Sequence, residues 1–130
     1  MLGGSGVLNV CGEWNAHSHY LPVVRARFNQ SLFGGAFGAA VLLQLMRAGA
    51  DAEMLWTGTD VDCGYGVLDG EARPTPLYHA RKLCARHVRP GDMVRFPTGE
   101  DARADLDAVV ARGEGRLSAL LVHLRQEKAT

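Results

Sequence analysis

The stretch VLNVCGEWNAHSHY, residues 7–20, joins a short apolar run to a cluster of polar and aromatic side chains. An apolar run of this length is typical of a buried strand, which we expect over residues 7–12. Polar residues follow it at once, beginning with the carboxylate of Glu13. Because α/β barrels gather their chemistry at the carboxyl ends of their strands, Glu13 is the first candidate for a functional residue.

The residues after this loop predict a helix from about residue 29 to 48. Apolar side chains recur three or four positions apart, which is the spacing of one helical face. They are Leu32, Ala36, Ala39, Leu43 and Met46. Gly49 supplies a stop signal at the carboxyl end. Three internal glycines, Gly34, Gly35 and Gly38, lack the spacing of a nucleotide-binding loop, so close packing of a neighbouring helix explains them better.

The same order of elements repeats further along the chain. The stretch AEMLWT, residues 52–57, has the length of a short strand, and Trp56 lies at its end. A loop rich in Gly and Asp follows over residues 58–73. Thr75 can then cap a second helix that begins with a proline and extends to about His87.

The last third of the chain has a different pattern. Beyond a turn at residues 90–92, apolar and polar residues alternate and turn residues intervene, which is typical of β-strands. We expect strands near residues 93–96, 106–110 and 117–124, with residues 112–115 as a hairpin connection. The expected fold class is therefore α/β, followed by strands of a small β-domain.

Composition excludes several classes of function. The chain has 130 residues, of which 47% are hydrophobic, so it has material for one modest core. Lys and Arg total 14 and Asp and Glu total 14, which leaves no field to hold nucleic acid or an anionic membrane. Cys11, Cys63 and Cys84 lack the spacing of a disulfide framework or a zinc site. No signal peptide or membrane span is recognised, so we expect a cytoplasmic chain.

Two strand-helix units followed by a few β-strands are too few elements for a complete α/β domain. Parallel strands are normally buried, with neighbours in the sheet and helices on both faces, and two units cannot supply these. We therefore expect an incomplete hydrophobic enclosure, with Glu13 and Trp56 at the same ends of adjacent parallel strands. The helices expected near 29–48 and 75–87 can cover only part of a barrel wall.

Five stretches together resemble one family of enzymes, the clan A retaining glycoside hydrolases, and within it family 39, the β-xylosidase and α-L-iduronidase-like enzymes. The stretches are GEWN at 12–15, FNQSLFGGAFGAAVLLQLMRAGAD at 28–51, MLWTGTD at 54–60, GEARPTPLYHARKL at 70–83 and GRLSALLVHL at 115–124. The resemblance covers nearly the whole chain, but only the carboxy-terminal part of such an enzyme. It implies that residues 1–90 are the last two strand-helix units of a (β/α)8 barrel, and that residues 91–130 are strands of a β-sandwich.

The resemblance also implies an active site. The family's catalytic nucleophile maps onto Glu13, although Gly12 replaces the hydroxyl residue that usually precedes it. Side-chain chemistry adds candidates for contact with a carbohydrate substrate, since an indole offers a flat apolar face and polar groups can bind hydroxyls. They are Trp14, Asn15, His17, His19, Trp56, Asp60 and Asp62. The family's acid/base Glu follows an Asn, and this chain has no Asn-Glu pair. We therefore expect half of an active site, without a metal or other cofactor, and another chain that completes the barrel as a further partner.

Plainer interpretations stay open beside this one. Glu13 at a strand end is also compatible with a solvated residue, and Trp56 with a core side chain. His17 and His19 have the His-x-His spacing of metal ligands but lack a third candidate ligand, so they read as loop hydrogen-bonders. A non-catalytic protein that binds carbohydrate or completes a barrel, and a gene remnant without a function of its own, are the alternatives to a glycosidase fragment.

Overall fold

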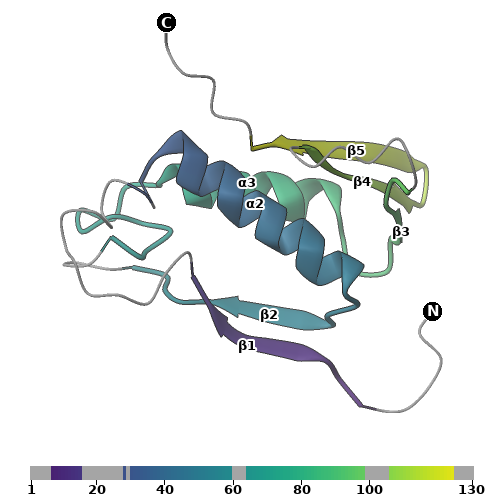
Figure 1. Cartoon of the computed structure of the whole chain (residues 1–130), viewed down its shortest axis with the longest axis horizontal. Helices are drawn as coiled ribbons and strands as arrows, with labels where there is room; N and C mark the ends of the chain where they lie inside the picture. Colours follow the sequence, from purple (N-terminus) through teal and green to yellow (C-terminus); the bar gives the residue numbers. More distant parts are fainter. Residues whose placement is uncertain (1–6, 16–27, 29, 60–63, 99–105, 125–130) are drawn as a thin grey trace, which may run out of the picture.

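The computed structural model describes residues 7–15, 28, 30–59, 64–98 and 106–124. Within these residues the fold is mixed α/β, with two helices and two separate sheets. Figure 1 shows the helices between the two sheets, with the strands β1 and β2 on one side and β3 to β5 on the other. The chain therefore forms three layers, in the order sheet, helices, sheet.

The first sheet consists of β1 (Val10–Trp14) and β2 (Ala52–Leu55), which pair in parallel. Cys11 lies opposite Glu53 and Trp14 lies opposite Leu55, so β1 has one residue more than β2 between these pairs. This bulge places both Gly12 and Glu13 opposite a single residue of β2. As a consequence Trp14, and not Glu13, shares the helix-facing side with Cys11.

The expectation of a buried strand over residues 7–12 is wrong in two respects. The strand begins at Val10 and continues to Trp14, and Val10 is 47% exposed. The cause is the small size of the sheet, because among the described residues β1 has β2 as its one neighbour and helices cover only one face. Val7, Leu8 and Met54 are also exposed, in agreement with the expected incomplete enclosure.

Helix α2 (Leu32–Arg47) begins three residues later than the sequence pattern suggests. Ser31 is its N-cap, because the Ser31 hydroxyl accepts a hydrogen bond from the Gly34 backbone N–H at 3.0 Å. The helix ends before Gly49, which adopts a φ of 77° and terminates it as expected.

Helix α3 (Pro76–His87) has the bounds and the cap that the sequence predicts. Thr75 accepts a hydrogen bond from the Tyr78 N–H, and its hydroxyl donates to the Val67 carbonyl at 2.8 Å. Helices α2 and α3 approach closely at Gly35, where an added Cβ would lie 2.9 Å from the Pro76 carbonyl carbon and oxygen. The interpretation of this glycine as a helix-packing residue is confirmed.

The second sheet contains β3 (Met93–Arg95), β4 (Leu106–Gly113) and β5 (Arg116–His123) in antiparallel order. The expected hairpin joins β4 to β5 through a tight turn in which Gly115 has a φ of 63°. Arg116 anchors this sheet to α3, because its guanidinium donates to the His87 carbonyl and to the Asp92 carboxylate, both at 2.6 Å.

The core lies between the helices and the antiparallel sheet. Its buried cluster consists of Ala39, Ala40, Leu42, Leu43, Cys84, Val109, Leu120 and Val122. The outer face of the antiparallel sheet is uncovered, with Leu117 74% and Leu121 67% exposed. In the part of the chain that the structure describes, no helix has the length and apolar character needed to cross a membrane.

Candidate functional site

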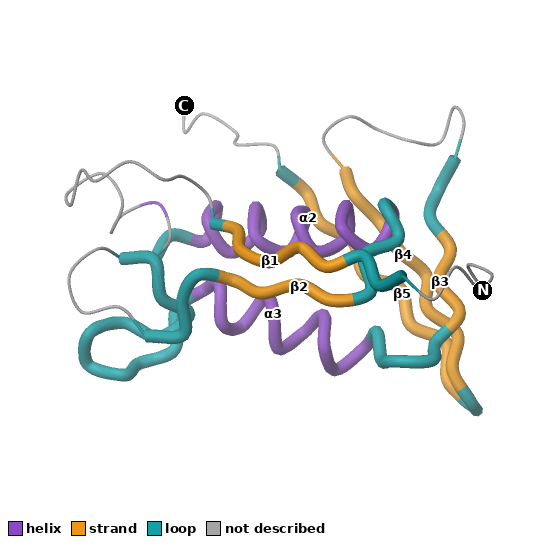
Figure 2. The backbone as a smooth tube through the Cα atoms, turned by 90° about the horizontal axis from the view of Figure 1, so that it is seen from below, coloured by secondary structure: helices purple, strands orange, loops and turns teal. Residues whose placement is uncertain are grey.

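The candidate site lies where β1 and β2 end together. The Trp56 backbone N–H donates to the Trp14 carbonyl at 3.1 Å, which extends the pairing from the last residue of β1 to the residue just after the end of β2. Glu13 and Trp56 are therefore at the same ends of adjacent parallel strands, as the sequence predicts. Figure 2 shows these two ends side by side, at the edge from which the loops leave the sheet.

Glu13 presents its carboxylate to solvent. The residue is exposed and lies in the bulge of β1, and within the described residues its side chain has no hydrogen bond or ion pair. Space is also open around its neighbour, because a Cβ added to Gly12 would have no atom within 4 Å. Among the described residues the Glu13 carboxylate is thus open to solvent and has no hydrogen-bond donor beside it.

The two tryptophans near the strand ends lie in different environments. Trp56 is 55% exposed, whereas Trp14 is half-buried and packs against the core cluster. The Trp14 indole N–H donates to Glu53 at 2.6 Å. Trp56 therefore has the free surface that stacking against a sugar ring needs. The role of Trp14 in substrate binding stays a prediction, and its indole faces the helices.

A half-buried ion pair holds Trp14 in place. The Arg81 guanidinium on α3 donates to both carboxylate oxygens of Glu53, at 2.5 and 3.2 Å, and lies 6.0 Å from the Trp14 ring. Both partners are shielded, with side chains 28% exposed for Arg81 and 19% for Glu53. A bidentate pair of this kind fixes the helix relative to the sheet. Sequence analysis did not single out these residues, although a lone carboxylate within an apolar strand is a recognisable signal.

Asn15 ties the strand end to the loop that follows β2. Its side-chain amide donates to the Trp56 carbonyl and, at 3.2 Å, to the Tyr65 carbonyl. The Asn15 amide thus connects the end of β1 to residues 56 and 65, which are more than 40 positions away in the sequence. Its place among the substrate-binding residues stays a prediction, and the contacts seen here are structural.

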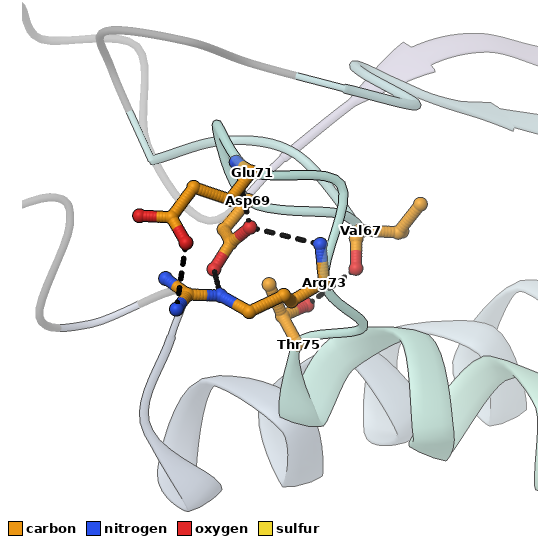
Figure 3. A network of polar contacts seen from close by, with 5 residues as sticks. All are labelled: Val67, Asp69, Glu71, Arg73 and Thr75. Carbon is orange, nitrogen blue, oxygen red and sulfur yellow. Dashed lines mark hydrogen bonds and ion pairs between the residues drawn. The ribbon is translucent and has the colours of Figure 1, made fainter.

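A compact polar network holds the segment from Val67 to Thr75, just before α3 (Figure 3). The Asp69 carboxylate accepts hydrogen bonds from the backbone N–H groups of Glu71 and Arg73 and from the Arg73 guanidinium, at 2.8 to 2.9 Å. Backbone and side-chain donors of Arg73 accordingly lower the pKa of Asp69. The Thr75 backbone N–H also donates to the Val67 carbonyl, so this segment is connected to the residue that caps α3.

The remaining residues of the predicted site cannot be placed. His17, His19, Asp60 and Asp62 lie outside the residues that the structure describes. Among the described residues, no group of three or more His, Cys, Asp or Glu side chains is arranged to hold a metal ion.

No model of a protein family matches this sequence, and no curated protein matches it either. The chemistry of the site therefore rests on its residues alone. An exposed carboxylate and an exposed indole, both at the carboxyl edge of a parallel sheet, are side chains that can meet the polar and the C–H faces of a sugar ring.

Proposed function

We propose that the chain is the carboxy-terminal part of a retaining glycoside hydrolase that acts on a xyloside- or uronide-like substrate, with Glu13 as the nucleophile. The observation that carries this proposal is the exposed carboxylate of Glu13, which has no partner among the described residues, at the same end of the parallel sheet as the exposed indole of Trp56. The resemblance of the surrounding stretches to family 39 supplies the reaction class. The proposed domains are residues 1–90, the last two strand-helix units of a (β/α)8 barrel, and residues 91–130, part of a β-sandwich.

The layering of the described residues is compatible with this division. Helices α2 and α3 cover one face of the parallel sheet, and exposed residues lie on the sheet, among them Val10 and Met54. In a barrel the uncovered face would be the interior, lined by further strands. The exposed apolar face of the antiparallel sheet would likewise be covered by a second sheet in a sandwich.

The chemistry requires two carboxyl groups. In a retaining enzyme one carboxylate attacks the anomeric carbon, while a carboxylic acid about 5–5.5 Å away protonates the departing oxygen. Glu13 would form the new C–O bond as the bond to the leaving group breaks. Because the Asn-Glu of the family's acid/base is absent, an alkoxide would have to leave unprotonated, and general acid catalysis is typically worth about 10²–10⁴-fold. We expect no turnover of natural glycosides by this chain alone.

An activated substrate tests the nucleophile separately from the missing acid. A 2-deoxy-2-fluoro xyloside or uronide with a dinitrophenyl leaving group needs little protonation, so a trace of covalent glycosyl-enzyme should accumulate. Peptide mass analysis should locate the sugar on Glu13. Glu13→Gln should abolish labelling, whereas the matched change Glu114→Gln, in the exposed β4–β5 turn, should leave it unchanged. Label on another residue, or labelling that survives Glu13→Gln, would show that the assignment is wrong.

A second candidate function is a non-catalytic protein that binds carbohydrate or completes a barrel. The exposed indole of Trp56 favours it, because a binding surface needs the platform but not the acid. The chain contains two tryptophans, so a sugar that contacts Trp56 should change the intrinsic fluorescence. A saturable change with xylobiose that survives Glu13→Gln but is lost in Trp56→Ala, without any covalent labelling, would favour binding over catalysis.

A further inference from the structure

A separate cavity of about 490 Å³ lies between β2 and the two helices. Its apolar wall is formed by Leu42, Leu45, Met46, Cys84, Ala85 and Val88. Glu13 and Trp56 are not among its lining residues, so it is distinct from the candidate glycosidase site. In Figure 2, α3 runs alongside β2 on the side away from β1. Its volume falls within the range of small-molecule sites.

Four charged residues line the cavity, and three of them are satisfied by protein groups. Glu53 and Arg81 form the bidentate pair already described. The carboxylate of Asp51 accepts a hydrogen bond from the Asn9 backbone N–H at 2.8 Å. Lys82 differs, because among the described residues it has no ion pair, and its ammonium lies 5.9 Å from the centre of the Tyr78 ring.

We propose that this cavity binds an elongated amphipathic anion, with an aliphatic body against α2 and α3 and a carboxylate at Lys82. The apolar wall accounts for the aliphatic body, since burial of each methylene is favourable by about 0.8 kcal/mol. The Lys82 ammonium, which has no ion pair among the described residues, accounts for the anionic head. The carboxylates of Asp51 and Glu53 already accept hydrogen bonds from protein donors, so neither is free to bind a cationic head group.

Comparing an anionic ligand with a neutral one of the same chain length tests whether the cavity selects the anionic head group. Decanoate, kept below its micelle concentration, should bind in a saturable one-to-one manner by isothermal titration calorimetry, and the neutral 1-decanol should bind more weakly. Lys82→Glu should weaken decanoate binding about tenfold, because an exposed charge attraction is replaced by a repulsion. The matched reversal Arg86→Glu, on the same helix but outside the cavity lining, should leave the affinity unchanged.

Two further measurements locate the site. Ala85→Phe should fill part of the cavity and reduce decanoate binding, whereas Leu121→Ser, which removes exposed apolar surface from the other sheet, should not. Bound decanoate should also slow the reaction of Cys84 with a thiol reagent, while Cys11 on β1 reacts at an unchanged rate.

Several results would overturn the proposal. These are the absence of saturable binding, equal affinity for decanol and decanoate, equal weakening by the two charge reversals, and loss of binding in Leu121→Ser. Saturable binding of a peptide that pairs with the edge of β2, without any binding of decanoate, would assign the cavity to a protein partner instead. All of these outcomes are independent of labelling at Glu13, so the proposal and the glycosidase function fail separately.

Discussion

The close contact between α2 and α3 makes Gly35→Ala a direct test of the fold. Gly35 is buried on α2, and an added Cβ would lie 2.9 Å from the carbonyl carbon and oxygen of Pro76 and 3.1 Å from its Cβ. The obstacle is the backbone of the first turn of α3, which the Thr75 cap holds in place. A flexible side chain could move away at little cost, but this backbone cannot.

Two opposing terms set the size of the effect. Replacing a helix-interior glycine by alanine normally stabilises by about 1 kcal/mol. Overpacking a tight contact costs about 1–3 kcal/mol, and an obstacle made of backbone favours the upper part of that range. We therefore expect Gly35→Ala to lower the free energy of unfolding by about 1–2 kcal/mol, which corresponds to a fall in Tm of roughly 4–8 °C.

Urea unfolding followed by circular dichroism at 222 nm measures this change. Gly12→Ala is the matched control, because it makes the same substitution where no atom lies within 4 Å of the added Cβ. The control should unfold within about 0.5 kcal/mol of the wild type, as a surface change away from special features does. If Gly35→Ala is as stable as the control or more stable, the close approach of the two helices is not as described.

The two remaining predictions concern ion pairs that join the layers. Glu53→Gln should lower the free energy of unfolding by about 1–3 kcal/mol, because it leaves the half-buried Arg81 guanidinium without its charged partner. A double-mutant cycle with Arg81→Met, measured by urea unfolding, should show a strong coupling free energy between the two residues. The pKa of Asp92 is lowered, first by the Arg89 backbone N–H and then by the Arg116 guanidinium, so its contribution to stability is present above its ordinary value of 3.8 and is lost as the pH falls through the lower folded value. The stability difference between wild type and Asp92→Asn should therefore be constant above about pH 5 and shrink as the pH falls below 4 in acid and urea titrations, and a difference that does not shrink with falling pH would contradict this account.

Local signals in the sequence were sufficient for most of the helices and strands. The Thr75 cap and the proline after it predicted the start of α3 correctly, because both act on the first turn of the helix itself. The hairpin between β4 and β5 was also predicted, since its turn residues are adjacent in sequence. Apolar spacing located α2 but placed its start three residues early, because spacing marks a helical face and not the cap at Ser31.

The candidate site was only partly readable from sequence. The sequence predicted that Glu13 and Trp56 lie at the same ends of adjacent parallel strands, and the parallel pairing confirms this placement. The Glu53–Arg81 pair was missed because its partners lie 28 residues apart and meet only when α3 packs on β2. The bulge in β1 was missed for the same reason, since register is a property of two strands and not of one.

The sequence alone therefore determined the order and type of the elements, because caps, turn residues and apolar periodicity act over a few neighbouring positions. The tertiary structure decided which faces are buried. Trp14 turns to the helices and Glu13 to solvent because the bulge shifts the alternation of β1. Val10, which reads as a core residue, is exposed because the described sheet has two strands and helices on one face only. Burial depends on what packs against a residue, and that is set by contacts between segments far apart in the chain.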